Sequence, residues 1–193
     1  IKMDKNRRHQ FIQDIKSEAR KLTKLAEGLK SVTDYKGTHV AQDLKPVNLV
    51  DMVDQVVRLL SQDARKKRLL LKRDGTPDSK TVLGEPDGLI QVLINLVVNA
   101  IQYTEQGEVR IILEEEGNHI KITVADTGSG ISSSDQELIF NEFYRTKQHA
   151  TKVRGHGLGL SIARDIVASH QSLLEVDSEP GKGSRFYFTL PVR

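Results

Sequence analysis

Residues 85–104 constrain the fold more than any other segment, because they predict a helix that is apolar on almost every side. A helix without a polar face has to be buried, so this segment predicts the central helix of the core. Gln91, Asn95 and Asn99 nevertheless recur at intervals of four residues, and Tyr103 continues the series. Because positions four residues apart lie on one face of a helix, the predicted core helix carries a polar stripe.

The polar stripe has two possible explanations. A buried amide without partners costs about 1–3 kcal/mol, so the side chains of the stripe need hydrogen-bond partners. One explanation is a network within the core itself. The other is a ligand that supplies the partners, since the carbonyl oxygen of asparagine is a suitable ligand for Mg²⁺, which also binds phosphates. The stripe alone leaves both explanations open.

The rest of the chain predicts a mixed α/β fold. Residues 11–34 have apolar side chains at three- and four-residue steps, which indicates a long first helix. A second helix is predicted from Asn48, a suitable N-cap, to about residue 66. Alternation and β-branched residues indicate strands, and Gly117 and Asn118 indicate a hairpin turn between two of them. The predicted strands are 69–72, 81–83, 108–113, 120–125, 173–176 and 185–190, and the later helices are 135–140 and 158–169.

The composition limits the classes of function. The chain has no cysteine, which excludes a disulfide scaffold, a zinc–thiolate site and a cysteine nucleophile. A formal net charge of +3 over 193 residues does not indicate a nucleic-acid-binding protein, for which a concentrated basic stripe is typical. No apolar run reaches the roughly 18 residues needed to span a bilayer, so we expect no membrane segment in this chain.

A glycine-containing loop follows the predicted strand that ends at residue 125. Its sequence is Asp126-Thr127-Gly128-Ser129-Gly130. A carboxylate at the end of a strand can accept a hydrogen bond from an exocyclic amine, and the glycines allow a flat ring to approach the backbone. An ordinary Asp-Thr-Gly turn would have the same sequence, so this loop alone indicates a binding site only weakly.

A second glycine-rich segment, Gly155-His156-Gly157-Leu158-Gly159-Leu160, opens the predicted helix 158–169. Glycines at the start of a helix can direct backbone N–H groups toward phosphates, with assistance from the helix dipole. The segment is not a P-loop, because no Lys-Ser/Thr pair follows. It is not a dinucleotide-binding fingerprint either, because no strand immediately precedes it. The remaining alternative is a flexible hinge.

The segment between the two glycine loops, residues 141–154, is rich in cationic side chains. It contains Arg145, Lys147, Lys152 and Arg154. A mobile lid over a triphosphate has this character, and so does a simple solvated loop. The order of the four features is more specific than any one of them: a polar-striped helix, a strand with an Asp-x-Gly-x-Gly loop, a cationic segment and a glycine-rich helix start.

In this order the motifs resemble the ATP-binding catalytic domain of sensor histidine kinases, in the superfamily that also includes type II topoisomerases and heat-shock chaperone ATPases. The resemblance covers about residues 81–191. Five sequence boxes match in order: the N-box, 91–100; the first glycine box, 126–130; the phenylalanine box, 139–145; the second glycine box, 155–162; and the closing strand, 181–191. The resemblance implies an α/β fold of the Bergerat type. This is a two-layer sandwich in which a mixed sheet of about five strands packs on three helices, here preceded by a long helix.

The resemblance also implies catalytic and metal-binding roles for the N-box. Asn99 would ligate Mg²⁺, Asn95 would help to orient the transferring phosphate, and Gln91 would belong with Asn95 to the catalytic group. The chain departs from the family at two positions. Many relatives have a basic residue where Gln102 stands, so one phosphate contact is expected to be missing. A glycine often occurs where Gln171 stands, and we expect little effect there.

The remaining implied roles concern ATP itself. Asp126 would accept a hydrogen bond from the adenine amine, and Tyr103 and Arg145 would contact the nucleotide. The glycine boxes would supply further nucleotide contacts, at Gly128, Gly130, Gly155, Gly157, Leu158 and Gly159.

The family's phospho-accepting histidine is followed by an acidic residue, and none of the six histidines of this chain is. His9 precedes Gln10 and is not a good match. We therefore expect a fragment that binds ATP but does not phosphorylate itself. Its expected parts are a remnant of the helical dimerisation and phosphotransfer domain at 1–37, a linker at 38–47 and the catalytic domain at 48–193.

By the same resemblance, the parent protein is a protein-histidine kinase of a two-component system. Its expected partners are the receiver domain of a response regulator and a second copy of itself, joined through the helical domain. We expect a cytoplasmic location, as the inner part of a membrane-anchored bacterial protein. Two alternatives are kept: a degenerate module that senses ATP or acts as a scaffold, and a serine kinase of the anti-sigma type on the same fold.

Overall fold

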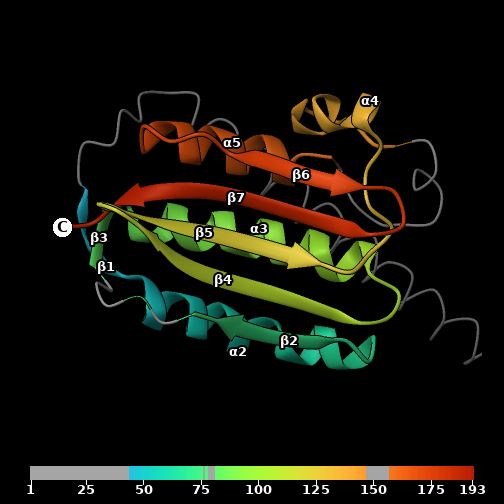
Figure 1. The fold of residues 1–193 in the computed structure, drawn as a ribbon, viewed down its shortest axis with the longest axis horizontal. Helices are drawn as coiled ribbons and strands as arrows, with labels where there is room; N and C mark the ends of the chain where they lie inside the picture. The colour runs from blue at the N-terminus through green and yellow to red at the C-terminus, as the bar shows by residue number, and fades with distance from the viewer. Residues whose placement is uncertain (1–43, 76, 78–80, 147–156) are drawn as a thin grey trace, which may run out of the picture. The chain divides into compact units, whose positions relative to one another are not determined.

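A mixed five-stranded sheet carries the long helices on one of its faces (Figure 1). The computed structural model describes residues 44–75, 77, 81–146 and 157–193, and all of them fall in one unit of the chain. Within these residues the elements are β1 (Lys45–Asn48), α2 (Leu49–Lys66), β2 (Leu70–Asp74), β3 (Thr81–Gly84), α3 (Pro86–Tyr103), β4 (Glu108–Glu116), β5 (His119–Asp126), α4 (Ser133–Gln136), the 3₁₀ helix η1 (Leu138–Phe140), α5 (Gly159–Ser169), β6 (Glu175–Glu179) and β7 (Gly183–Pro191). This arrangement confirms the predicted two-layer α/β sandwich.

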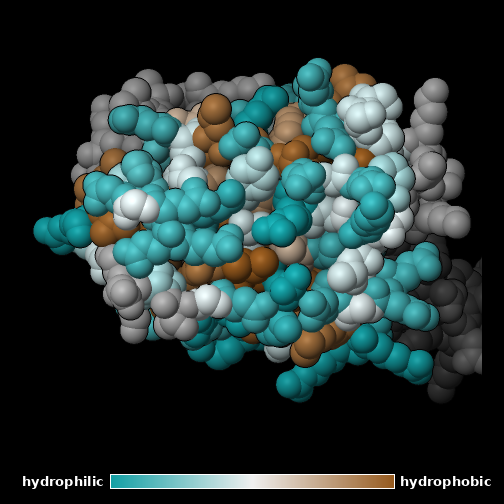
Figure 2. All heavy atoms as spheres, in the orientation of Figure 1, coloured by the Kyte–Doolittle hydropathy of each residue, from teal (hydrophilic) through white to brown (hydrophobic). Residues whose placement is uncertain are grey.

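One face of the sheet is hydrophobic and the other is hydrophilic. Its strand order is β2-β4-β5-β7-β6, with β2 parallel to β4 and the other neighbours antiparallel. In β4, Val109, Ile111 and Leu113 are at most 2% exposed, whereas Glu108 and Arg110, which alternate with them, are only half-buried. Successive side chains of a strand point to opposite faces. The core therefore lies between the sheet and the helices, and the opposite face is mostly hydrophilic (Figure 2).

Helix α3 lies at the centre of the helical layer. It contacts α2, α5 and the central strand β5. Leu89, Val92, Leu93, Leu96 and Val97 are each at most 1% exposed. The prediction of a buried core helix from residue 85 to residue 104 is therefore confirmed, and this helix is the element to which the other parts of the site are attached.

The two predicted N-terminal helices have different outcomes. The second is confirmed as α2, which begins after Asn48, whose side chain accepts hydrogen bonds from the backbone N–H groups of Val50 at 3.1 Å and Asp51 at 3.2 Å. The first, at 11–34, lies outside the described residues, as does the predicted helical remnant at 1–37. Among the described helices, none combines the length and the hydrophobicity of a transmembrane span.

Several boundaries differ from the sequence prediction, and two of the differences have a clear physical reason. The described end of the predicted linker 38–47 forms β1, which pairs antiparallel with β3; Pro46 is tolerated because β1 has a neighbour on one side only. The strand predicted at 173–176 begins instead at Glu175. The chain first has to turn after α5, through Gln171 at a φ of +58°, and this leaves Leu173 exposed rather than in the sheet.

His170 joins the end of α5 to the start of α3. Its ring is buried, its Nε2 atom accepts a hydrogen bond from the backbone N–H of Glu85 at 2.9 Å, and its Nδ1 atom lies 2.7 Å from the carbonyl oxygen of Ile166. A carbonyl can only accept, so Nδ1 carries the proton and Nε2 is the acceptor. One neutral imidazole thus satisfies two backbone groups at the ends of two helices.

Replacement of His170 by alanine is expected to lower the free energy of unfolding by about 2–3 kcal/mol, because it leaves a cavity and removes the hydrogen bond to the N–H of Glu85. Urea denaturation followed by circular dichroism measures the change. His119→Ala is the matched control, since His119 is exposed at the start of β5 and should change stability by no more than about 0.5 kcal/mol. Equal losses in the two variants would contradict a connecting role for His170.

Candidate functional site

The polar stripe of α3 faces the beginning of α5. Gln91 Nε2 donates to Asn95 Oδ1 at 2.8 Å, and Asn95 Nδ2 donates to the carbonyl oxygen of Gly159 at 3.0 Å. A Cβ atom on Gly159 would lie 3.7 Å from Asn95 Cγ, so the two helices are in direct contact here. An internal network therefore accounts for two residues of the stripe, Gln91 and Asn95, and it fixes the orientation of the Asn95 amide.

Asn99, one turn further along α3, differs from them. Its side chain is half-buried, and no hydrogen bond joins its amide to any residue that the structure describes. The described residues contain no cluster of three or more histidine, cysteine or acidic side chains that could hold a metal ion. A cation beside Asn99 would therefore take the amide oxygen together with oxygens of a bound phosphate and water. This is the manner in which Mg²⁺ commonly binds next to nucleotides, so the donor set fits that ion.

Asp126 lies at the end of β5, beside the end of α3. Its Oδ1 atom accepts a hydrogen bond from the N–H of Gly128 at 2.8 Å. Burial raises the pKa of Asp126 above its ordinary value, and the backbone N–H groups of Gly128 and Ser184 offset part of this rise by stabilising the charged form. A Cβ atom on Gly128 would lie 2.6 Å from the carbonyl oxygen of Tyr103. Only glycine allows this approach, which brings Asp126 and Tyr103 together.

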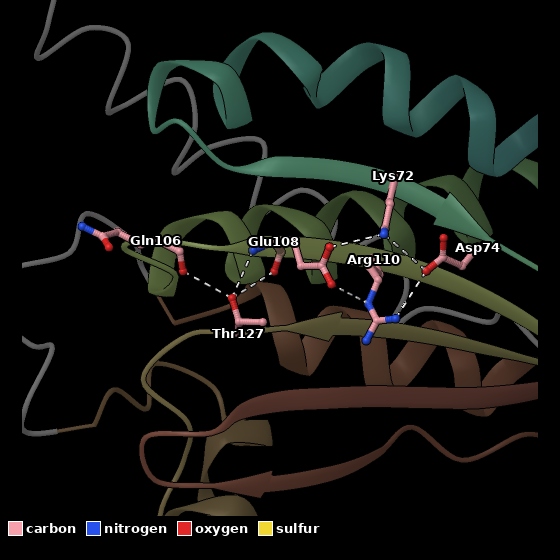
Figure 3. A network of polar contacts seen from close by, with 6 residues as sticks. All are labelled: Lys72, Asp74, Gln106, Glu108, Arg110 and Thr127. Carbon is pink, nitrogen blue, oxygen red and sulfur yellow. Dashed lines mark hydrogen bonds and ion pairs between the residues drawn. The ribbon is translucent and has the colours of Figure 1, made fainter.

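The first glycine loop, residues 126–131, is anchored on one side to β4. The Oγ1 atom of Thr127 accepts a hydrogen bond from the N–H of Glu108 at 3.1 Å and donates to the carbonyl oxygen of Gln106 at 3.3 Å (Figure 3). The carboxylate of the same Glu108 pairs with Arg110 at 3.1 Å and Lys72 at 3.3 Å. The loop thus begins from a section of sheet that is crosslinked to the edge strand β2.

On its other side, the first glycine loop is held by the turn between β6 and β7. Gly181 N–H donates to the carbonyl oxygen of Ser129 at 2.8 Å. Ser178 Oγ accepts from Ile131 N–H at 2.8 Å, and Gln136 Nε2 donates to the carbonyl oxygen of Ser178 at 2.8 Å. The end of β5 and the β6–β7 turn lie at the same end of the sheet (Figure 1). Sequence reasoning missed Ser178 and Gln136, for which no local signal exists.

The start of α5 has no side-chain cap among the described residues. The N-cap, Leu158, offers no side-chain hydrogen bond to the first turn, and its side chain is buried. The first N–H groups of a helix have no partner within the helix, and together with the helix dipole they favour an anion. Since Asn95 lies against Gly159, an anion at this helix start would lie beside the polar stripe of α3. This geometry fits a phosphate group.

Gly157 lies next to residues of the phenylalanine box. It has a φ of +71°, and its carbonyl oxygen accepts a hydrogen bond from Phe143 N–H at 2.9 Å. A Cβ atom there would lie 2.8 Å from the carbonyl oxygen of Tyr144. Gly157 therefore fits against the phenylalanine box, in a conformation that favours glycine. Gly155, Lys147, Lys152 and Arg154 lie outside the described residues.

Tyr103 and Arg145 lie close enough to interact. Burial raises the pKa of Tyr103, and the positive charge of Arg145 opposes that rise. The structure thus gathers Asn95, Asn99, Tyr103, Asp126 and Arg145 around the C-terminal half of α3. These five predicted residues come from three separate parts of the chain.

Comparison with known proteins identifies the family. Residues 84–193 match the model of the histidine kinase-, DNA gyrase B- and HSP90-like ATPase family. The sensor histidine kinase ZraS of Escherichia coli strain K12 is 35% identical over 185 residues, covering 95% of this chain and 38% of ZraS. The adaptive-response sensory kinase SasA of Synechococcus elongatus is 33% identical over 179 residues, covering 92% of this chain and 46% of SasA. The chain thus spans less than half the length of these curated relatives.

Solved structures have the same fold. The catalytic domain of the histidine kinase ThkA superposes with a TM-score of 0.68 at 29% identity, covering 78% of this chain and 97% of that one. Full-length ShkA, solved in complex with AMPPNP, superposes with a TM-score of 0.86 at 24% identity, covering all of this chain and 41% of ShkA. Together with the family match, these relatives establish that the chain belongs to the histidine kinase-, DNA gyrase B- and HSP90-like ATPase family, as an ATP-binding catalytic domain of the sensor histidine kinase type.

Proposed function

We propose that this domain binds ATP together with Mg²⁺ and positions the γ-phosphate for transfer to a histidine outside this chain. The observation that carries the proposal is the arrangement of the α3 stripe: Asn95 is fixed against the start of α5, while Asn99 keeps a half-buried amide without a described partner. A fixed amide beside a free one suits a site in which the protein positions a phosphate and leaves a ligand position open. The other residues of the site are consistent with adenine and phosphate binding.

Each residue has a proposed part in binding. Asp126, as a carboxylate, accepts a hydrogen bond from the adenine amine, and Gly128 and Gly130 allow the ring to approach the backbone. Asn99 provides an oxygen for Mg²⁺, which neutralises phosphate charge when it is bound. Gln91 holds Asn95 in the orientation seen here, and Asn95 orients the phosphate at the start of α5. Tyr103 and Arg145 close the site from the side of the phenylalanine box.

We propose that the larger protein transfers the phosphoryl group in two successive steps. A histidine accepts the phosphoryl group first, and an aspartate of a response-regulator receiver domain accepts it next. The histidine kinase ThkA, solved in complex with the response regulator TrrA, supports such a partner, since it superposes on the whole of this chain with a TM-score of 0.76 at 25% identity. Dimerisation through the helical part and a cytoplasmic, membrane-anchored location are proposed on the same family grounds. The scaffold and serine-kinase alternatives are not favoured, because the relatives are sensor histidine kinases.

The direct test is calorimetric titration of the chain with a non-hydrolysable ATP analogue, with and without Mg²⁺. We expect saturable binding that strengthens when Mg²⁺ is added. Addition of [γ-³²P]ATP and a helical acceptor domain from a related kinase should then give acid-labile phosphate on the acceptor. Absence of binding under both conditions would overturn the proposal. Binding with acid-stable phosphate on the acceptor would instead support a serine kinase.

The raised pKa of Asp126 predicts a pH dependence of nucleotide binding. Only the carboxylate form lacks a proton on oxygen and accepts freely from the adenine amine. Because burial moves the pKa of Asp126 upward, the protonated form becomes populated at a higher pH than for an ordinary aspartate, and affinity falls as the pH drops through this raised value. Titrations between about pH 8 and about pH 5 measure the effect.

Comparison with Asp126→Asn isolates this carboxylate, because protonation of the nucleotide phosphates affects both proteins equally. We expect the variant to bind more weakly at neutral pH, to discriminate less between adenine and guanine nucleotides, and to lose the extra pH dependence. Parallel pH profiles for the two proteins would contradict the role of Asp126. So would equal binding of ATP and GTP by the unmodified chain.

A further inference from the structure

The C-terminal turn of α3 depends on hydrogen-bond donors from outside the helix. The last four carbonyl groups of a helix have no partner within it, and the last turn of α3 contains no basic residue. The carbonyl oxygen of Ala100 accepts from the N–H of Thr104 at 3.1 Å and from its hydroxyl at 2.7 Å. The carbonyl oxygen of Tyr103 accepts from Ser129 N–H at 3.3 Å. The two carbonyl groups between them, those of Ile101 and Gln102, need another donor.

Lys67 provides it from the end of α2. Its Nζ atom lies 2.8 Å from the carbonyl oxygen of Ile101, 2.8 Å from that of Gln102 and 3.0 Å from that of Thr104. An ammonium group has three N–H donors and no acceptor, so all three of its donors have a carbonyl partner. Lys67 is itself held as the C-cap of α2, where its backbone N–H donates to Ala64. The side chain that carries the ammonium group therefore starts from a fixed backbone position.

These contacts hold the backbone at Tyr103 and on both sides of it. Lys67 binds the carbonyl groups of Gln102 and Thr104, which flank Tyr103 in sequence, while the carbonyl of Tyr103 carries the first glycine loop through Ser129. The ammonium also lies at the negative end of the α3 dipole, at the end of the helix where the adenine is proposed to bind. A shift of this turn would move both Tyr103 and the loop that starts at Asp126.

We propose that Lys67 is a positioning residue of the nucleotide site, whose ammonium group holds the last turn of α3 and thereby sets the place of Tyr103 and of the first glycine loop. This inference rests on the proposed nucleotide binding. Lys67 acts on the nucleotide site through the backbone of α3 and does not contact the ligand itself. Its neighbour Lys66 shows the ordinary alternative: it pairs with Asp63 at 2.8 Å, and both side chains are more than half exposed.

The test compares Lys67→Met with Lys66→Met by titration with the ATP analogue and Mg²⁺. Both variants remove one positive charge from adjacent positions and keep an unbranched side chain. We expect Lys67→Met to weaken binding about three- to tenfold, as for loss of hydrogen bonds from a charged group, and Lys66→Met to stay within about twofold of the unmodified chain. Lys67→Arg, which keeps a charged donor at this position, should restore at least half of the loss.

A second readout separates positioning from general stability. In a Tyr103→Ala background, Lys67→Met should weaken binding by a smaller factor than in the unmodified chain, because the Tyr103 side chain, one of the two groups that Lys67 positions, is gone and the two effects are not additive. Thermal unfolding of every variant checks that each is folded at the temperature of titration. Should Lys67→Met fail this check, Lys67→Gln takes its place, since its amide retains N–H donors without the charge.

The outcomes are distinguishable. If the unmodified chain binds and Lys67→Met binds equally well, the positioning role is overturned and nucleotide binding stands. The role is also overturned if the loss in Lys67→Met persists undiminished in the Tyr103→Ala background, or if Lys66→Met loses as much affinity. If the unmodified chain itself does not bind, the proposed function fails before Lys67 is tested.

Discussion

Replacement of Asn99 by alanine is expected to remove the Mg²⁺-dependent part of ATP binding and to leave the fold intact. The Asn99 amide has no partner among the described residues, so its loss breaks no hydrogen bond to any of them. Alanine favours a helix more than asparagine does, so the free energy of unfolding should stay the same or rise slightly. Loss of one contact to a charged ligand corresponds to about ten- to a hundredfold in affinity, and calorimetry with and without Mg²⁺ measures it.

Asn118→Ala provides the matched control. Asn118 is exposed in the turn between β4 and β5, at the opposite end of β5 from Asp126, and its replacement should affect neither affinity nor stability. Unchanged nucleotide affinity in Asn99→Ala would exclude Asn99 as the proposed Mg²⁺ ligand. A loss of affinity that is the same with and without Mg²⁺ would assign Asn99 to the nucleotide rather than to the ion.

Replacement of Gly183 by alanine is expected to lower the free energy of unfolding by about 3–5 kcal/mol. Gly183 has a φ of +90°, a conformation that disfavours any side chain. A Cβ atom there would also collide with the carbonyl group of Asp126 and lie 3.0 Å from Thr127 Cα. Since both neighbours are backbone, relief of the collision requires β5 and β7 to move apart. Urea denaturation measures the loss, and nucleotide titration should show weaker binding because Asp126 is displaced.

Gly181→Ala separates the two causes. Gly181 belongs to the same turn and has a φ of +79°, but a Cβ atom there would meet nothing within 4 Å. Its replacement should therefore lower the free energy of unfolding by only about 1–2 kcal/mol, the cost of placing a side chain in this backbone conformation. Equal losses at the two positions would mean that the collision at Gly183 is relieved without consequence and that backbone conformation alone explains both.

The parts of the fold that sequence predicted are those that depend on local periodicity. The apolar pattern of residues 85–104 identified α3, and Asn48 identified the start of α2, because burial and capping act over one or two helical turns. The stripe at Gln91, Asn95 and Asn99 indicated the candidate site, since four-residue spacing determines a helix face. The strand boundaries near 45 and 175 were missed because they depend on the pairing of β1 with β3 and on the turn at Gln171.

The contacts that complete the site could not be predicted in this way. Ser178, Gln136 and Lys67 are common polar residues with no spacing that marks them, and each acts on a segment that is distant in sequence. The sequence also could not separate the members of the polar stripe. That Asn95 is paired, while Asn99 has no partner among the described residues, could not be read from their spacing, because the pairing of Asn95 depends on the position of Gly159, which only the packing of α5 on α3 determines.

The attachment of the first glycine loop to the β6–β7 turn sets an order of events during synthesis. The carbonyl group of Ser129 and the N–H group of Ile131 gain their partners only after residues 178–181 have been made, and β5 gains its second neighbour only with β7. A nascent chain that ends before this turn has an unpaired edge on β5 and a first glycine loop that is held on the β4 side alone. The site is therefore among the last parts of the growing domain to form, so ATP cannot stabilise the half-made sheet by mass action.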